Sequence, residues 1–535
     1  MAISLYAYWE VQSLGNNNNS GVFDPETTMS ATLSSANGTS TSPTVTASNY
    51  SFVSTDVGNW LYVKSGTSWY PGWYLISSIA GTSAIINATK FQAVNANLQN
   101  AYLDGIGSAV SLSSGTWAID YSQKNTSYIN YSDIQLLTST TITSSGNTLR
   151  PSMIGNSINI MGGSGFTSGL YVITSMTGTT ATVDRGMGTA GSTGGTGILG
   201  GALGTLQAAL TGSTSISDKT AIFVKNDGTY TCNTDTFIPG TACLQNVVGY
   251  GTYRYDQQKP TISIGSSSTC IKTSTFIKVF NFIFDGNSNA NSIAVNTNNQ
   301  GGNLYNCHFK NLTGCVNFGG HLMKGLVQNC TNINIPFFHD TVLTGCTAIG
   351  NTCFFNASFE DCLIYNNSAS QDVVSVLCQS NRNIYNCTFY NNTAPKLLNL
   401  INADSRVTTI FTFNNIFAGN SGTVFNISGG YHSNAYDMVT NAFHNNGAIG
   451  SEPPNTLGSH INFVEDEIIL TGSPFINAAN SDFRLNNITG AGASCRNRGL
   501  MPLNPFFNIQ NYMNVGAVQS KNPYINLNLT GGIGG

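Results

Sequence analysis

Asn386-Cys387-Thr388-Phe389-Tyr390-Asn391-Asn392 decides the fold, because related phrases recur through the second half of the chain. The clearest are Asn306-Cys307-His308-Phe309, Asp361-Cys362-Leu363-Ile364-Tyr365-Asn366-Asn367 and Asn414-Asn415-Ile416-Phe417. The position of Cys387 recurs at residues 282, 307, 330, 346, 362, 387, 415 and 441, with spacings of 25, 23, 16, 16, 25, 28 and 26 residues. A coil of three short strands and three turns has about this length. The two 16-residue intervals indicate tight turns or a misassigned coil.

Side-chain alternation separates a core face from an outer face in each copy. Alternate residues of a strand point to opposite sides, so Cys387 and Phe389 should face the core while Thr388 and Tyr390 face outward. Successive coils lie about 4.8 Å apart, which places equivalent positions in line. The Asn pair that ends the phrase suits a corner, because Asn tolerates the left-handed conformation. The eight repeat positions should therefore form one inward-facing stack.

Cys and Asn are frequent in that stack. Asn415 and Asn441 can bond to each other as an internal amide ladder. The chain has 12 cysteines, five of them at the repeat position and none in a CxxC zinc pair. Stacked cysteines have parallel Cβ vectors, which do not give the dihedral angle of a disulfide. We expect buried free thiols at Cys307, Cys330, Cys346, Cys362 and Cys387.

The flanks of the repeat resemble the ends of a known family. A helical segment at 205–210 precedes the apolar run 221–231, while residues 470–477 and 482–485 resemble closing coils and 515–519 a terminal phrase. These features are similar to those of phage-type, pectin-lyase-like repeat proteins. The resemblance implies an all-β chain with a right-handed parallel β-helix at 201–490, beginning near residue 204, and a closing segment at 491–535. In this family a small helix caps the open core. The resemblance is specific for fold and weak for function.

Residues 1–200 form a different region with a repeat of its own. Residues 44–86 align without a gap to 141–183, at an offset of 97, with 13 identities in 43 positions. Gly58, Gly72 and Gly81 match Gly155, Gly169 and Gly178, which predicts matched turns. Alternating apolar residues predict a small module of three or four strands in each copy.

Composition narrows the class of protein. Charged residues make up 8% of the chain and the formal net charge is −4. This argues against a nucleic-acid binder, which would carry a basic stripe. No Lys or Arg precedes Lys64, and we expect neither a secretory signal peptide nor a transmembrane span. Such a chain suits a protein released by cell lysis, as a virion component is.

Motifs for catalysis or cofactor binding are weak. Gly186-Met187-Gly188-Thr189-Ala190-Gly191 matches GxGxxG, but residues 192–197 read as a flexible linker where a nucleotide site needs a helix. His321 faintly resembles the histidine motif of polygalacturonases, whose paired Asp and Arg-x-Lys motifs are missing. No cluster of acids with a nearby Arg suggests a calcium site. We therefore assign no catalytic, cofactor-binding or metal residue.

Two pairs of titratable residues are weak candidates for a glycan-cleaving site. His339-Asp340 and Glu360-Asp361 are 21 residues apart and could lie on adjacent coils. A glycosidase needs two carboxyl groups about 5 to 10 Å apart. However, Asp361 occupies the position that Asn306, Asn329 and Asn386 hold in other copies, so a polar corner residue is the simpler interpretation. The acidic run at 465–467 reads as a solvated loop.

Three functions remain open. The first is a structural virion protein, such as a fibre, spike or exterior appendage of head or tail, whose expected partners are other virion proteins and host surface glycans. Its trimeric state follows from the habit of the phage family. The second is a β-helix enzyme that depolymerises polysaccharide, with aromatic rings and paired acids in a groove. The third is a bacterial surface adhesin, which should carry an export signal.

Overall fold

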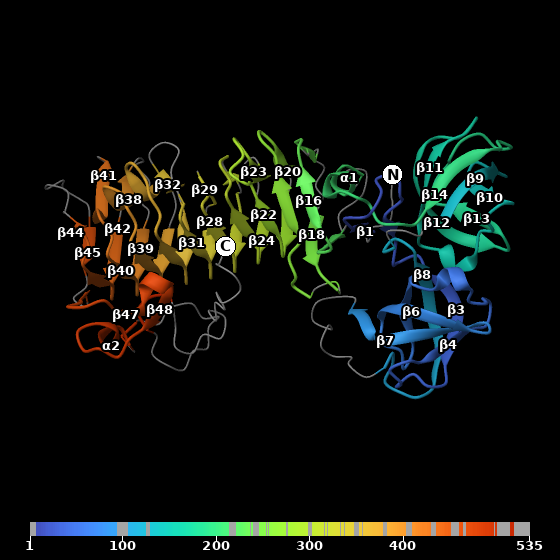
Figure 1. The fold of residues 1–535 in the computed structure, drawn as a ribbon, viewed down its shortest axis with the longest axis horizontal. Coiled ribbons are helices and arrows are strands. Elements are labelled where there is room, and N and C mark those ends of the chain that lie inside the picture. The colour runs from blue at the N-terminus through green and yellow to red at the C-terminus, as the bar shows by residue number, and fades with distance from the viewer. Residues whose placement is uncertain are drawn as a thin grey trace. The chain divides into compact units, whose positions relative to one another are not determined.

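The computed structural model describes residues 7–517, except 94–104, 125–128, 213–220, 236, 239–244, 253, 255, 274–275, 298–301, 315, 318, 332, 336, 347–351, 356, 378–381, 403–408, 430–434, 451–459, 464–466, 497 and 500–513. The chain is all-β (Figure 1). Its contacts divide it into two compact units. The first holds residues 1–232, 236–262 and 275–282, and the second holds 233–235, 263–274 and 283–535.

Three parallel sheets build the second unit, and each strand pairs with the strand three places later in the chain. The first sheet contains β24 (Gly302–Tyr305), β27 (His321–Met323), β30 (Phe337–His339), β33 (Ser358–Glu360), β36 (Arg382–Tyr385), β39 (Thr409–Phe413), β42 (Ala435–Val439) and β45 (His460–Phe463). The second contains β22 (Ile283–Asp285), β25 (His308–Lys310), β28 (Leu326–Gln328), β31 (Val342–Thr344), β34 (Leu363–Tyr365), β37 (Thr388–Tyr390), β40 (Ile416–Ala418), β43 (Ala442–His444) and β46 (Ile468–Ile469). The third contains β20 (Thr269–Thr273), β23 (Ile293–Asn296), β26 (Val316–Asn317), β29 (Ile333–Asn334), β32 (Thr352–Phe355), β35 (Asp372–Leu377), β38 (Lys396–Asn402), β41 (Thr423–Gly429) and β44 (Ala448–Gly450).

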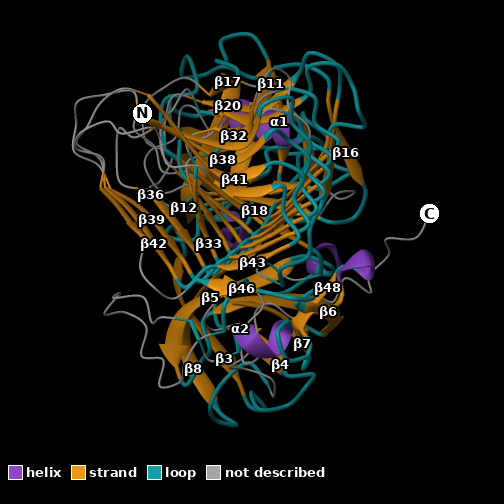
Figure 2. Ribbon diagram, turned by 90° about the vertical axis from the view of Figure 1, so that its left-hand side faces the viewer, coloured by secondary structure: helices purple, strands orange, loops and turns teal. Residues whose placement is uncertain are grey.

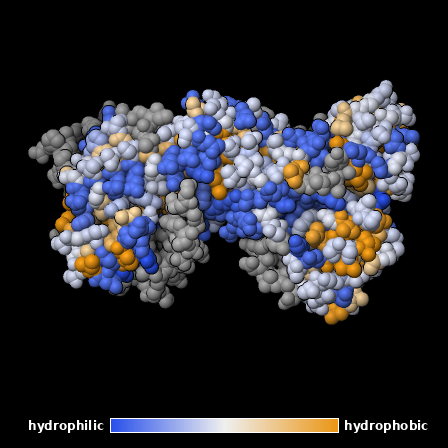
Figure 3. Space-filling model, in the orientation of Figure 1, coloured by the Kyte–Doolittle hydropathy of each residue, from blue (hydrophilic) through white to orange (hydrophobic). Residues whose placement is uncertain are grey.

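Figure 2 separates the three sides of these coils. Strands β36, β39 and β42 form one side, β32, β38 and β41 another, and β43 and β46 the third. This strand order is that of a parallel β-helix, as the repeat predicts, while its right-handedness stays a prediction. Hydrophilic residues cover much of the visible surface around β22 and β24 (Figure 3).

Single left-handed residues turn the chain at two corners of each coil. At the first corner, between the first and second sheets, φ lies between 48° and 56° at Asn306, Lys324, Asp340, Asp361, Asn386, Asn414 and Thr440. At the second corner, between the second and third sheets, φ lies between 47° and 66° at Asn311, Asn329, Gly345, Asn366, Asn391, Gly419 and Asn445. The expectation that Asn occupies corners is confirmed, because Asn adopts this conformation more readily than most residues.

The residues that follow the corners form two inward columns, so the expectation of a single stack is wrong. The first column contains Cys307, Gly325, Thr341, Cys362, Cys387, Asn415 and Asn441. The second contains Leu312, Cys330, Cys346, Asn367, Asn392, Asn420 and Asn446. Cys330 and Cys346 thus belong to the second corner. Position 282 lies in the first unit and is buried as well.

Burial of the five cysteines is confirmed. All five are buried, and none forms a disulfide with another described cysteine. Each thiol donates to the carbonyl oxygen two residues earlier, at distances of 3.4, 3.2, 3.6, 3.1 and 3.0 Å for Cys307, Cys330, Cys346, Cys362 and Cys387. Burial raises the pKa of Cys346 to about 12 and raises those of Cys330 and Cys387 too. The reduced state stays a prediction, which thiol counting in denaturant with and without reductant tests.

The C-terminal residues cover the outer face of the second sheet. β47 (Phe475–Asn477) and β48 (Asp482–Leu485) pair antiparallel, so the expectation that they are closing coils is wrong. They are followed by α2 (Gly492–Cys495), and this segment packs in one apolar cluster with strands of the second sheet. The Ala517 N–H donates to Thr388 Oγ1 at 3.0 Å, which explains why the outward Thr388 is buried.

The first unit begins with a parallel sheet. β1 (Tyr8–Val11) pairs with β15 (Ala221–Lys225), which continues to β18 (Gln245–Tyr250) and β21 (Ile277–Phe280). β2 (Val22–Phe23) pairs antiparallel with β1. The predicted short helix is α1 (Leu206–Gly212), where Thr205 Oγ1 accepts the Ala208 N–H at 3.1 Å. It packs against β1 and β15.

Two closed six-stranded barrels complete the first unit, and each repeated segment supplies four of the six strands, which agrees with the expected module of three or four strands. The first barrel has the order β3-β4-β7-β6-β5-β8, from β3 (Met29–Ser35), β4 (Thr44–Ala47), β5 (Trp60–Thr67), β6 (Gly72–Ala80), β7 (Ser83–Ala93) and β8 (Leu112–Asp120). The second has the order β9-β10-β13-β12-β11-β14, from β9 (Ile129–Leu136), β10 (Thr141–Thr143), β11 (Ser157–Gly162), β12 (Gly169–Thr177), β13 (Thr180–Val183) and β14 (Gly195–Leu199). Pairing β3 with β8, and β9 with β14, closes each barrel outside the repeated segments 44–86 and 141–183.

The two barrels have the same strand order, and their matched glycines have similar backbones. The φ angles are 83° and 86° at Gly58 and Gly155, and 61° and 60° at Gly81 and Gly178. Descent of both modules from one duplicated segment stays an inference from their sequences. Part of the expected linker 192–197 is instead the start of β14, where a Cβ on Gly195 would lie 2.5 Å from the Phe166 ring.

A fully buried arginine lies within the first unit. Arg254 Nη2 is 3.1 Å from Glu10 Oε2 and 3.9 Å from Asp120 Oδ2. The guanidinium carbon is 4.3 Å from the centre of the Phe223 ring. Tyr250 donates its hydroxyl to the same Glu10 carboxylate. This cluster couples β1, β8 and β15, and we assign it a structural role because paired charges are the usual form of buried charge.

Candidate functional site

One row of outward side chains runs across six coils of the first sheet. Strand register aligns its members directly with one another. The row, called the outer row below, consists of Tyr305, Met323, His339, Glu360, Tyr385 and Phe413. All six side chains are half-buried, so each presents part of its surface to solvent.

Aromatic rings flank the middle of the outer row. Tyr385 and Phe413 stack with their ring centres 5.6 Å apart and an angle of 10° between the planes. On the other side, Lys324 Nζ lies 5.5 Å from the centre of the Tyr305 ring. His321, in the neighbouring row, lies 4.6 Å from the Phe337 ring. Sheet geometry therefore places rings on both sides of the His339–Glu360 pair.

The acidic candidates meet between these rings, so the expectation that they lie on adjacent coils is confirmed. His339 and Glu360 are direct register partners, and Asp340 and Asp361 occupy the following corner positions. His339 Nδ1 is 3.6 Å from Glu360 Oε2 and 3.9 Å from Asp361 Oδ2. These separations exceed hydrogen-bond length, and they make a close ion pair when the imidazole is protonated. The exposed fractions are 32%, 29% and 23% for His339, Glu360 and Asp361.

The pKa values of this cluster reflect its crowding with carboxylates. Contact with Glu360 raises the pKa of His339 most; burial lowers it, and the nearby carboxylates raise it further. Burial raises the pKa of Asp340, against the opposing effect of His339 and Lys324. Burial also raises the pKa of Asp361, which the hydrogen bond from Asn386 partly offsets.

Asp361 also ends an amide ladder, which gives it a structural role. Asn414 Nδ2 donates to Asn386 Oδ1 at 3.1 Å, and Asn386 Nδ2 donates to Asp361 Oδ1 at 3.0 Å. A carboxylate is a natural end for such a ladder, because it accepts a bond and has no N–H of its own to satisfy. Two other ladders end in the same way. Asn329, Asn311 and Asp285 form one, and Asn426, Asn399 and Asp372 the other.

This arrangement permits proton transfer and ligand binding, and favours binding. A histidine in contact with a carboxylate can accept or donate a proton near neutral pH. Asp340 and Asp361 lie on adjacent coils, about 4.8 Å apart along the stack. Both occupy the same corner, so they do not flank the outer row from opposite sides, as two carboxyl groups must flank a scissile bond. Sequence reasoning identified the acids but missed the aromatic residues, whose alignment depends on strand register.

The other sequence candidates lie apart from this cluster. His321 is exposed beside Phe337. Residues 465 and 466 lie outside the described residues, and Glu467 is half-buried with its pKa raised by burial. Residues 186–191 lead into strand β14, so the helix that a nucleotide site needs is replaced by a strand. Within the described ranges, no group of three or more His, Cys, Asp or Glu side chains could hold a metal ion.

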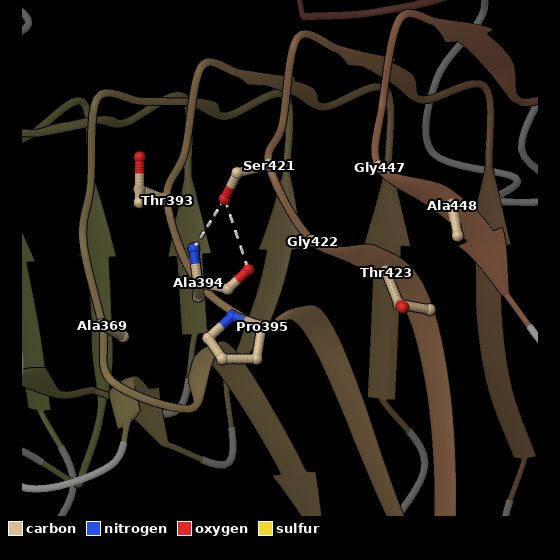
Figure 4. Close-up of a pocket in the computed structure, with 9 residues that line it drawn as sticks. All are labelled: Ala369, Thr393, Ala394, Pro395, Ser421, Gly422, Thr423, Gly447 and Ala448. Atoms are coloured by element: carbon tan, nitrogen blue, oxygen red, sulfur yellow. Dashed lines mark hydrogen bonds between the residues drawn. The ribbon is translucent and has the colours of Figure 1, made fainter.

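A shallow groove lies beyond the second corner of the later coils (Figure 4). Its volume is about 550 Å³, and it is lined by Ala369, Thr393, Ala394, Pro395, Ser421, Gly422, Thr423, Gly447 and Ala448. Ser421 Oγ accepts the Ala394 N–H at 3.2 Å. A Cβ on Gly422 would lie 2.0 Å from Ala394 O, so the glycine permits close approach of adjacent coils. None of these lining side chains is titratable, which leaves the groove without acid–base chemistry.

Comparisons with known proteins give distant structural likeness only. No family model matches the chain, and no curated protein matches it. The A-module of the mannuronan C-5 epimerase AlgE4 of Azotobacter vinelandii is 11% identical, with 48% of this chain and 94% of that chain covered and a TM-score of 0.22. The catalytic domain of a GH87 alpha-1,3-glucanase is 11% identical, with coverage of 66% and 92% and a TM-score of 0.20. The tailspike protein gp49 of Pseudomonas phage LKA1 is 12% identical, with coverage of 64% and 67% and a TM-score of 0.17. Likeness at this level carries no argument about function.

Proposed function

We propose that this chain is an exterior structural protein of a virus particle that binds host-surface glycans through the outer row. The outer row carries this proposal, because it combines aromatic rings with polar side chains across successive coils. Aromatic rings supply rigid apolar contact area, and a small number of polar groups fix the orientation of a ligand. Low charge in the chain and sparse acid–base groups suit weak, multivalent contact.

The coils suit a structural role. Their strands are paired with neighbours through most of the stack, and their inward corner amides bond from coil to coil. Such pairing leaves few backbone groups accessible to proteases. In the part of the chain that the structure describes, no helix is long and apolar enough to cross a bilayer. The trimeric state, the partners in the particle and a position on head or tail belong to the same proposal.

A glycan array tests the binding proposal. The intact chain should bind a subset of host-surface glycans, and Tyr385→Ala should weaken that binding about tenfold, since a ring contact contributes roughly 1 kcal/mol or more. Thr423→Ala, in the shallow groove, is the matched control and should bind as the unchanged chain does. Equal binding by Tyr385→Ala would contradict a role for the outer row. Mass spectrometry of particles from the source would test the virion assignment.

Polysaccharide cleavage is the second candidate, and the contact between His339 and Glu360 favours it. In that case the imidazole and a carboxyl group would exchange a proton with the substrate. Incubation with host capsular or cell-wall polysaccharide, followed by analysis of chain length, tests this function. Depolymerisation that disappears in Asp340→Asn or Asp361→Asn would establish an enzyme in place of a binding protein. Intact polysaccharide after prolonged incubation would leave binding as the function.

A further inference from the structure

Charge around the outer row is distinctly unbalanced. The carboxylates of Asp340, Glu360 and Asp361 gather around the single imidazole of His339. The clearest cation nearby is Lys324, whose Nζ is directed toward the Tyr305 ring while its charge lowers the pKa of Asp340. Among the described side chains, three carboxylates face one histidine and one lysine even when the imidazole is protonated. The middle of the row is therefore negative at neutral pH.

Among the residues that the structure describes, only part of this negative charge is neutralised. Asp361 accepts a hydrogen bond from Asn386 at 3.0 Å, a neutral donor. Glu360 has the imidazole at 3.6 Å as its ion-pair partner. Half-buried carboxylates in this setting attract a positively charged group and repel another carboxylate, because solvent screens such charges less than it does at an exposed surface.

We propose that the ligand of the outer row is a glycan with free amino groups, as in a deacetylated hexosamine polymer, and that carboxylate-bearing polyuronates are excluded. This inference rests on the proposed glycan-binding function. An ammonium group of the sugar would lie against Glu360, and the adjoining sugar ring would contact Tyr385, the next residue of the row. A uronate would add a further negative charge beside three carboxylates. Neutral acetylated sugars retain the ring contact and lack the ion pair.

Three oligosaccharides of equal length separate these possibilities. Titration calorimetry of the full chain should give the tightest binding for a β-1,4-linked glucosamine oligomer, weaker binding for its N-acetylated form, and none for a galacturonate oligomer. Glu360→Gln should weaken glucosamine binding about fivefold, the effect of losing one partly exposed ion pair. The same variant should change binding of the acetylated oligomer less than about twofold. Added salt should weaken glucosamine binding alone.

Glu26→Gln is the matched control, because Glu26 is an acid in the first unit whose Oε2 lies 3.1 Å from Lys64 Nζ. It should leave all three affinities unchanged. Equal or tighter binding of galacturonate, or a Glu360→Gln variant that binds glucosamine as the unchanged chain does, would overturn the charge preference while leaving glycan binding in place. Failure of all three oligomers, with no effect of Tyr385→Ala on the glycan array, would overturn the proposed function itself. Circular dichroism of each variant verifies that the fold is retained.

Discussion

The later coils, from β36 to β43, and the middle coils, from β27 to β33, turn the same corners with different side chains. In the later coils the second inward column is made of asparagines: Asn392 Nδ2 donates to Asn420 Oδ1 at 2.9 Å, and Asn420 Nδ2 donates to Asn446 Oδ1 at 2.9 Å. In the middle coils the inward positions hold Gly325, Thr341 and cysteines. Amides thus satisfy each other in one region, and small or apolar residues fill the other.

The left-handed residues of the first corner also differ between the two regions, with asparagines in the later coils and charged residues in the middle coils. Asn386 and Asn414 form a ladder in the later coils, whereas Lys324, Asp340 and Asp361 occupy the equivalent positions in the middle coils. The titratable cluster therefore lies where the amide ladder stops. Departures from a locally consistent pattern are expected at functional sites, where stability is given up for binding or chemistry. The comparison separates residues that hold the coil together from residues available to a ligand.

Breaking the ladder of asparagines in the second inward column should have the largest effect on stability. Asn392 Oδ1 accepts the backbone N–H of Asn367 at 3.1 Å and its side-chain amide at 3.0 Å. Asn392→Leu removes this acceptor inside the core, so we expect a loss of about 3 kcal/mol in the free energy of unfolding. Denaturant unfolding followed by circular dichroism measures it. The neighbouring Asn391→Gly, at an exposed left-handed corner, should cost less than about 1 kcal/mol. Equal losses of unfolding free energy in the two variants would refute a special role for the asparagines of the second inward column.

Extending the asparagine ladder of the first inward column, from Asn415 to position 387, should have a smaller effect on stability. The Cys387 N–H already donates to Asn415 Oδ1 at 2.9 Å, as the N–H of a ladder asparagine does. In Cys387→Asn the new amide can donate to Asn415 as well, so the free energy of unfolding should change by less than about 1 kcal/mol. Cys387→Leu adds volume without a hydrogen bond and should lose about 2 kcal/mol. If the Asn variant is the less stable of the two, the corner cannot accept a ladder at that coil.

Sequence periodicity predicted the later coils well, because their corners carry Asn and their strands carry Phe389 and Phe417 in equivalent places. The middle coils broke the pattern. Gly325 and Thr341 occupy the positions equivalent to Cys387 but do not resemble it. The repeat was therefore assigned to Cys330 and Cys346, which belong to the second corner. The interval between those two cysteines is a real short coil of 16 residues.

Features that depend on distant pairing could not be predicted. Barrel closure joins β3 to β8, far apart in the chain, and no local pattern encodes that pairing. The outer row depends on the register of His339, Glu360 and Tyr385, whose spacing varies with coil length. Glu10 and Arg254 are 244 residues apart in the chain, so the fold alone brings them together. Sequence thus predicted the acids of the candidate site and not their aromatic neighbours.

Asp361→Asn extends the ladder of corner asparagines, Asn414 and Asn386, by one coil. This variant tests whether the charge of Asp361 lowers the stability of the folded protein. Burial raises the pKa of Asp361, so its charged form is disfavoured in the folded protein. The stability of the folded state then falls as pH rises from the ordinary Asp range through the raised pKa. Asp361→Asn retains an acceptor for Asn386 and removes the charge, which should stabilise the protein by up to about 1 kcal/mol at neutral pH. Thermal melts at neutral pH and at pH 3 measure the difference. A variant that melts lower at neutral pH would contradict this reasoning.

The contact between His339 and Glu360 should give the smallest effect. Glu360 raises the pKa of His339, so stability from the protonated imidazole is fully present below the ordinary histidine pKa. It is lost as pH rises through the raised value. Glu360→Gln removes the main cause, and the imidazole titration followed by NMR should move to lower pH. Asp285→Asn, on the second sheet, should leave it unmoved. An unchanged midpoint in Glu360→Gln would mean that the two side chains do not meet in solution, and the ion pair between them would then be absent from the row.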